Sequence, residues 1–210
     1  MALELYFAPG SCAFAPLVLL EEAGAEFTAH RLVLANGDQR RPDFLAINPL
    51  GRVPALVVDG TIVTEAIAVM SFIASRFPEA HLLPTGDPVA LGKCYEMMAW
   101  LATNQQVYIA QLWRTDRFVD EPTAVAALKE AALERLKAGF QQIEERIAGP
   151  WAMGESYSAV DPYLGVFRRW AERLELDTGQ WPAWSAQHRR LLDRPATQAA
   201  LAREAAPAAD

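Results

Sequence analysis

The strand signals of this chain all lie in its first 64 residues, and this uneven distribution constrains the fold more than any other feature. Short runs of β-branched and aromatic residues are typical of strands, whereas apolar positions that recur every three or four residues are typical of helices. We expect strands at residues 3–7, 27–34, 54–58 and 61–63, and helices at residues 13–23, 43–47 and 64–77, the last of them capped by Thr64. Asp59 and Gly60 form a two-residue turn of the type that hairpins favour. This order predicts a compact α/β unit with a mixed sheet.

Beyond the turn-rich segment at residues 81–87, only helical patterns remain. We expect helices at residues 88–117, 123–147 and 163–174, and two shorter ones that open at Pro182 and Pro195. Ser158, Asp161 and Pro162 have the spacing of a capped helix start. The chain is therefore predicted to consist of a small α/β half followed by a larger all-α half.

The charge balance argues against one class of partner. The chain has 19 Lys and Arg residues against 26 Asp and Glu, a formal net charge of −7. Without a basic surplus to neutralise phosphates, non-specific nucleic-acid binding is not expected. A hydrophobic content of 52% and a charged content of 21% are ordinary for a globular protein. No run approaches the ~20 apolar residues that cross a bilayer, so no membrane association is expected.

Cysteine and histidine usage bounds the compartment and the metal chemistry. Only Cys12 and Cys94 are present, which is too few for a disulfide framework. The three histidines are scattered and offer no metal-ligand spacing. The N-terminus lacks the basic region, apolar core and cleavage site of an export signal. We therefore expect a reduced, cytoplasmic protein without a structural metal.

A hydroxyl and a thiol stand where the first strand gives way to a helix. Pro9 and Gly10 break the strand, and Ser11 and Cys12 follow at the expected first helical turn. Unpaired backbone N–H groups and the positive end of the helix dipole favour a negative charge there, such as a thiolate. Alternatively, Ser11 only caps the helix and Cys12 is a small buried side chain.

Residues 48–56 (Asn-Pro-Leu-Gly-Arg-Val-Pro-Ala-Leu) contain two prolines, of which Pro54 opens an expected strand. A cis Val53–Pro54 bond would turn the N–H and C=O of Val53 outward, where they could pair with an extended peptide ligand. An ordinary turn with a trans proline is the alternative.

Glu65 and Ala66 form a third candidate feature at the start of the next helix. A carboxylate gains there from the helix dipole, which is a sufficient structural reason for it. It could also bind a ligand ammonium, beside backbone N–H groups that are free to take a ligand carboxylate.

Taken together, these segments resemble bacterial glutathione S-transferases of the beta-class type. The resemblance rests on four segments, residues 7–12, 48–56, 64–69 and 154–161, and so spans nearly the whole chain. It implies a thioredoxin-like glutathione-binding domain at residues 1–80, a linker at 81–87 and an all-helical domain at 88–210 that forms the electrophile pocket. It also implies glutathione as co-substrate and a homodimer.

The resemblance assigns roles to particular residues. Cys12, and with it Ser11, would face the glutathione sulfur. The backbone of Val53, fixed by Pro54, would pair with the cysteinyl part of glutathione. The remaining contacts would come from Glu65 and the N–H of Ala66 at the γ-glutamyl end, and from Arg52 at the glycyl carboxylate.

The sequence departs from the family pattern at three places. Ala66 has no hydroxyl where the family usually has Ser or Gly. A histidine common in the fourth helix of bacterial relatives is replaced near Tyr108, and an expected lysine has no counterpart at residues 36–39. Tyr6 resembles a tyrosine that other classes use in catalysis, but as an aromatic on a strand it is expected in the core.

The function implied is attack by a glutathione thiolate on a small apolar electrophile held between the two halves. Residues of the fourth helix that would bind this electrophile, and that also fit a helix core, are Asn104, Tyr108, Leu112 and Trp113. Two alternatives differ in class. One is a monothiol, glutathione-dependent thiol-disulfide oxidoreductase or peroxidase that uses Cys12. The other is a non-catalytic ligand-binding protein with the same fold.

Overall fold

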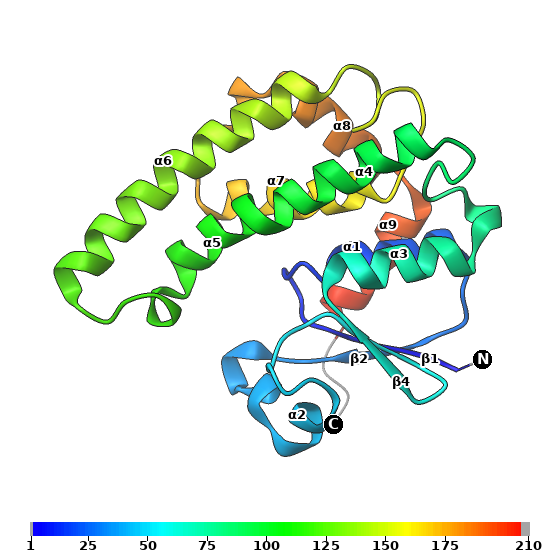
Figure 1. The fold of residues 1–210 in the computed structure, drawn as a ribbon, viewed down its shortest axis with the longest axis horizontal. Helices are drawn as coiled ribbons and strands as arrows, with labels where there is room; N and C mark the ends of the chain where they lie inside the picture. Colours follow the sequence, from blue (N-terminus) through cyan, green and yellow to red (C-terminus); the bar gives the residue numbers. More distant parts are fainter. Residues whose placement is uncertain (1, 207–210) are drawn as a thin grey trace.

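The computed structural model describes residues 2–206, in which a four-stranded sheet with its helices comes first and only helices follow (Figure 1). The first part contains β1 (Leu3–Phe7), α1 (Phe14–Glu22), β2 (Thr28–Arg31), α2 (Pro42–Ile47), β3 (Ala55–Val58), β4 (Thr61–Thr64) and α3 (Ala66–Arg76). The strand order is β2–β1–β3–β4, with β1 parallel to β2 and antiparallel to β3. The predicted element order and mixed sheet are confirmed.

The two faces of β1 explain how the sheet is covered. Leu3, Leu5 and Phe7 are buried and belong to the core with α1 and α3. The alternate residue Tyr6 points to the opposite face, where it contacts Phe44 of α2. This period of two is what the alternation of side chains along a strand requires.

The β3–β4 hairpin turns at Asp59 and Gly60, both with positive φ (47° and 84°), as the tight hairpin turn requires. The expected cap of α3 was wrong. Thr64 pairs with Ala55 as the last residue of β4, and Glu65 takes the N-cap position with φ +69°. The left-handed backbone at Glu65 turns the chain sharply from strand to helix, so Thr64 stays in the ladder.

The remaining helices are α4 (Pro88–Trp100), α5 (Gln106–Trp113), α6 (Pro122–Arg146), α7 (Val160–Arg173), α8 (Pro182–Leu192) and α9 (Pro195–Ala205). The single helix expected at residues 88–117 was wrong in one respect. A π-helical stretch, Leu101–Gln105, separates α4 from α5, and a short 3-10 turn, Thr115–Arg117, follows α5. The wide turn buries the Gln105 side chain against Gly139 of α6, where any Cβ would clash with it.

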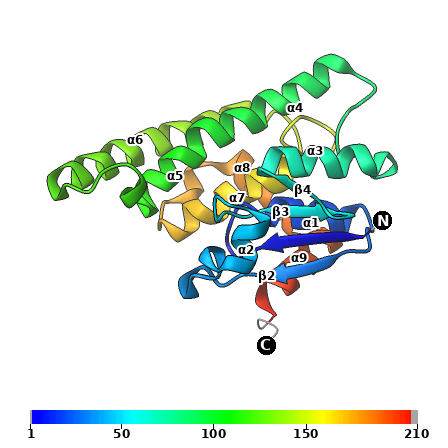
Figure 2. The ribbon, with the colours of Figure 1, turned by 60° about the horizontal axis from the view of Figure 1, so that its bottom comes forward.

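Helix α1 lies at the centre of the molecule. It packs against α3 of its own half and against α7 and α9 of the helical half. Figure 2 shows α9, the last helix, beside α1 on the sheet-containing half. The chain therefore returns to its beginning, and the two halves share one apolar core. The expected second domain extends to residue 210, of which residues 207–210 lie outside the described part. Within residues 2–206, no helix is both long and apolar enough to span a bilayer.

Candidate functional site

A cleft of about 740 Å³ lies between the two halves, with Cys12 in its lining. This volume is within the usual range of small-molecule sites. The sheet-containing half contributes residues 9–12, 39–40 and 49–53, and the helical half contributes residues of α5, the turn after it and α7.

The loop that carries Cys12 is held by the helical half. Gly10, with φ +72°, donates its N–H to Oε1 of Glu204 in α9 at 2.9 Å. Its C=O accepts from Nε1 of Trp170 in α7 at 2.8 Å. Glu204 is buried and also pairs with Arg169 at 2.6 Å. Both polar groups of Gly10 are thus fixed by residues about 160 and 194 positions away.

Ser11 shows the bland role that the sequence left open. Its hydroxyl donates to the C=O of Ala8 at 2.7 Å and accepts from the N–H of Ala13 at 3.2 Å. Helix α1 begins at Phe14, so Ser11 and Cys12 lie in the turn that precedes it. The hydroxyl proton of Ser11 would have to leave Ala8 before it could serve a ligand.

The Cys12 sulfur is buried between two partners. It donates to the C=O of Val53 at 3.6 Å and accepts from Nε2 of Gln106 at 3.6 Å. Burial raises the pKa of the Cys12 thiol from 9.0 to about 11, against the lowering effect of the Gln106 hydrogen bond. The charge of Glu65 also raises this pKa. Cys12 is therefore a protonated thiol at neutral pH, not the thiolate that a helix start favours.

Gln106, at the start of α5, connects Cys12 to the core of the helical half. Its Oε1 accepts from the hydroxyl of Tyr163 at 2.8 Å, while its Nε2 faces Cys12. Tyr163 is fully buried, and burial raises its pKa well above 10.0. The phenol thus stays protonated and fixes the amide with its N–H toward the sulfur.

The segment before β3 meets Cys12 through its backbone. The Val53–Pro54 bond is cis, the state for which the sequence offered an alternative, and Pro54 is buried. The preceding C=O, that of Arg52, accepts from Nδ2 of Asn48 at 2.7 Å. The Arg52 side chain is exposed on the cleft lining.

Glu65 and Ala66 lie outside the cleft lining as the described residues define it, at the N-terminus of α3. Glu65 is exposed, Ala66 is buried, and no side chain caps this helix. The first-turn N–H groups of α3 are therefore available to a ligand carboxylate. The effect of Glu65 on the Cys12 pKa shows that its charge is felt at the sulfur.

Of the four expected electrophile-binding residues, Trp113 alone belongs to the cleft lining within residues 2–206. Tyr108 and Leu112 pack against the apolar core, and Asn104 donates to the C=O of Trp100 and to Thr103 within the π-helical stretch. The face that lines the cleft instead contains Gln106, Ile109, Ala110 and Trp113. A π turn shifts the phase of every later residue, so an uninterrupted helical period selects the wrong face after residue 105.

The sequence reading missed several cleft residues. Gln106 and Ile109 share the helical spacing of Trp113, and a search from Trp113 backward in steps of three and four would have found them. Trp170 and Arg173 come from α7, about 60 residues further along the chain, and no local pattern connects them to the cleft.

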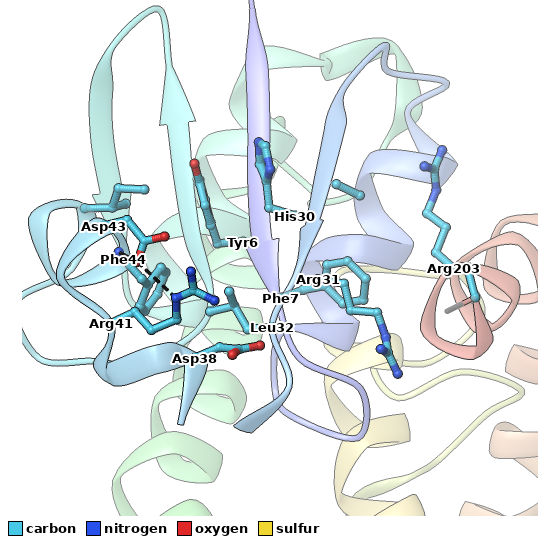
Figure 3. A pocket seen from close by; sticks show the side chains of 13 residues that line it. Tyr6, Phe7, His30, Arg31, Leu32, Asp38, Arg41, Asp43, Phe44 and Arg203 are labelled. Carbon is cyan, nitrogen blue, oxygen red and sulfur yellow. Dashed lines mark hydrogen bonds and ion pairs between the residues drawn. The ribbon is translucent and has the colours of Figure 1, made fainter. Parts of the chain in front are cut away.

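A second pocket of about 550 Å³ lies on the α2 face of the sheet (Figure 3). Tyr6 stacks on His30 there, with ring centroids 4.4 Å apart, and Arg41 faces Asp43 at 3.7 Å. Burial, followed by the charge of Glu4, raises the pKa of Tyr6. Tyr6 thus faces away from the core side of the sheet, contrary to the expected core position, but its aromatic packing role is as expected.

No cluster of three or more potential metal ligands occurs among the described residues. Cys12 and Cys94 are both free and buried.

Comparison with known proteins identifies the relatives of this chain. Residues 1–75 match the family model "Glutathione S-transferase, N-terminal domain". The chain is 30% identical over 208 residues to glutathione S-transferase GstA of Escherichia coli O157:H7, covering 96% of this chain and 98% of that protein. It is 29% identical to glutathione S-transferase GST-4.5 of Xanthomonas campestris, with the same coverage. A solved glutathione transferase homologue from Sulfitobacter, with bound glutathione, superposes with a TM-score of 0.92 at 33% identity over 96% of this chain and 98% of that one.

Proposed function

Because this chain belongs to the glutathione S-transferase family, we propose that it conjugates the thiolate of glutathione to small electrophiles with an apolar body. The observation that carries the proposal is the Cys12 thiol, placed in the interdomain cleft between the Val53 C=O and the Gln106 amide.

Glutathione fits the polar groups that line one side of this cleft. Its cysteinyl backbone would pair with Val53, beside the cis bond to Pro54. Its γ-glutamyl ammonium would meet Glu65, and its γ-glutamyl carboxylate the free N–H groups that begin at Ala66. Arg52 would take the glycyl carboxylate.

The acidity of Cys12 decides which sulfur keeps the proton. A free thiol has a pKa of about 8.5, so only a few per cent of free glutathione is ionised at pH 7. Cys12, with a pKa of about 11, holds its proton more tightly than glutathione does. When glutathione pairs with Val53, the Cys12 S–H is released to donate to the glutathione sulfur. Cys12 thus stabilises the thiolate as a hydrogen-bond donor, and Ser11 supports the loop.

The bond-forming step then uses the ionised glutathione sulfur. A C–S bond forms at the electrophilic carbon, and either a leaving group departs with its electron pair or a proton from solvent adds to the neighbouring carbon. The apolar body of the electrophile would lie against Ile109 and Trp113 of α5. Asn104, Tyr108 and Leu112 would act on this pocket only from behind, through the packing of the helix.

The oxidoreductase and binding-protein alternatives are distinguished by the state of Cys12. A monothiol oxidoreductase or peroxidase needs a Cys12 thiolate as nucleophile, and the raised pKa works against it. A non-catalytic binding protein would not ionise glutathione.

The test is the ultraviolet absorbance of the thiolate during titration with glutathione across pH. Wild type and a Cys94→Ala control, which removes the other buried thiol, are expected to give a saturable band near neutral pH. In Cys12→Ala the band is expected to appear about one pH unit higher, since one hydrogen bond to the thiolate, worth about 1.4 kcal/mol, is lost. Glutathione binding without any band would contradict conjugation. A mixed disulfide between Cys12 and glutathione, seen by mass after incubation with glutathione disulfide at neutral pH, would favour the redox function instead.

We also propose that residues 1–80 bind glutathione and that residues 88–210, joined by residues 81–87, form the electrophile pocket of a cytoplasmic homodimer. The family resemblance supports this organisation. Light scattering during size-exclusion chromatography is expected to give twice the mass of the 23.1 kDa chain.

A further inference from the structure

Five arginines surround the interdomain cleft, although the chain as a whole is acidic. They come from four separate parts of the fold and are Arg40, Arg52, Arg114, Arg117 and Arg173. Asp116 is the one carboxylate on the same lining. The cleft therefore carries a surplus of positive charge in a chain of net charge −7.

Nothing in the described chain neutralises these guanidinium groups. Within residues 2–206, none of the five pairs with a carboxylate within 4.0 Å, and none donates a side-chain hydrogen bond. The arginines are close enough to repel one another: burial lowers the pKa of Arg117, and Arg52, Arg114 and Arg40 lower it further. Asp116 partly opposes this effect.

The ordinary uses of surface cations account for only part of the cluster. Arg114 is the C-cap of α5, and a cation at a helix C-terminus gains about 0.3–1 kcal/mol from the dipole. Arg173 lies over the ring of Trp113 at 4.8 Å from its centroid. In the proposed function, Arg52 takes the glycyl carboxylate of glutathione, with Arg40 beside it. Arg114 and Arg117 are left facing the part of the cleft where the electrophile would lie.

We infer that the second substrate is an organic acid, whose planar apolar body lies against Trp113 and Ile109 and whose carboxylate is held by Arg114 and Arg117. The inference rests on the proposed function, because it describes the second substrate of that reaction. It restricts the electrophile from any apolar compound to one with an anionic end.

The geometry of α5 sets the length of such a substrate. Gln106 touches the Cys12 sulfur, and Arg114 stands eight residues later. At 1.5 Å per residue, the two positions are about 12 Å apart along the helix. After the sulfur of glutathione takes its share of that distance, one aromatic ring with a short acidic arm fills the rest.

A matched pair of probes isolates the acid group. The para-methacryloyl derivative of phenoxyacetate has its activated double bond and its carboxylate at opposite ends of one ring. Its primary amide has the same double bond without the charge. With both probes the glutathione sulfur adds to the terminal carbon of the double bond and a solvent proton adds to the inner carbon, so no other reactant is needed.

The experiment compares kcat/KM for the two probes, each corrected for its uncatalysed rate. Wild type is expected to prefer the acid by about tenfold or more, and added salt is expected to reduce the preference. Arg114→Gln combined with Arg117→Gln is expected to bring the ratio near one, by loss of the rate with the acid. Arg114→Lys with Arg117→Lys is expected to keep most of it. Arg135→Gln, an exposed arginine on α6 outside the cleft, is the matched control and is expected to keep the wild-type ratio.

Two readouts separate this inference from the proposed function. If the amide is conjugated and the acid is not preferred, or if the Gln variant keeps the preference, the inference is overturned and conjugation stands. If neither probe is conjugated, conjugation fails, and calorimetry with the saturated isobutyryl analogues still decides the inference. Tighter binding of the acid analogue than of its amide, lost in the Gln variant, would support it, and equal binding would overturn it.

Discussion

The thiol of Cys12 has its acidity set by neighbours rather than by its place before a helix. Burial raises its pKa to about 11, and the Gln106 amide is the side chain that opposes this effect. The dipole of α1 does not outweigh burial here, because α1 begins two residues later and Cys12 belongs to the preceding turn. The residue chemistry follows from enclosure by both halves of the molecule.

At this scale we predict a specific pH dependence of Cys12 alkylation. In a Cys94→Ala background, the rate with iodoacetamide is expected to rise about tenfold per pH unit from pH 7 to 10 without a plateau, because the thiolate fraction follows a pKa of about 11. Gln106→Leu is expected to slow the reaction at every pH in this range, since the hydrogen bond that lowers the pKa is removed. Gln141→Leu, at an exposed position of α6, serves as control. A plateau below pH 8 would show that Cys12 is a low-pKa nucleophile.

Among the elements, the start of α7 is the most heavily capped. Asp161 is fully buried and accepts from the N–H of Ala152 at 2.7 Å and the N–H of Ser158 at 2.8 Å. Gln187 of α8 donates to it at 2.9 Å, and the Ser158 hydroxyl accepts from Val160. The Ser158–Asp161 spacing read from the sequence is thus confirmed as a capping arrangement, and it also connects α7 to α8. Burial raises the pKa of Asp161, while these hydrogen bonds lower it.

Asp161→Ala is expected to lower the free energy of unfolding by at least about 3 kcal/mol, because it leaves several buried donors without an acceptor. Urea denaturation followed by circular dichroism measures the loss. Asp177→Ala is the matched control, since Asp177 caps Gly179 at an exposed turn, and it is expected to cost about 1 kcal/mol. Equal losses in the two variants would show that the buried network of Asp161 contributes nothing beyond an ordinary cap.

For the molecule as a whole, the helical half fixes the loop that carries Cys12, and its stability therefore bears on the site. Its buried His188 is the group whose pKa departs most clearly into the acid range. Burial lowers the His188 pKa from 6.5 to about 4, and Arg168 and Arg169 lower it further. A lowered pKa in the folded state means that the unfolded chain binds the proton more readily. The stabilisation is complete above pH 6.5 and is lost as the pH falls toward 4.

We predict that wild type loses about 3 kcal/mol of stability between pH 6.5 and 4 through His188 alone, at about 1.4 kcal/mol per pKa unit. His188→Gln, which does not titrate, is expected to show a correspondingly shallower decline when urea denaturation is repeated across this range. His81→Gln, at an exposed position, is expected to follow the wild-type profile. Parallel profiles for wild type and His188→Gln would contradict the prediction.

The sequence by itself determined the kind and order of the elements, because these depend on local patterns. Alternating apolar residues marked β1, Asp59 and Gly60 marked the hairpin, and prolines marked the starts of α8 and α9. The Cys12 loop was located for the same reason, since a strand that ends at Pro9 and Gly10 before a helix is a local event. Boundaries failed only where the backbone took an unusual conformation, as at Glu65.

The tertiary structure alone decided which side chains meet. The π-helical stretch before α5 exists because Gln105 packs against Gly139 of α6, and it turns Gln106 and Trp113 rather than Tyr108 toward the cleft. The clamp on Gly10 and the gathering of arginines from distant segments likewise depend on contacts between parts of the chain that no sequence window contains. Burial, which no single residue possesses by itself, then fixes the proton on Cys12.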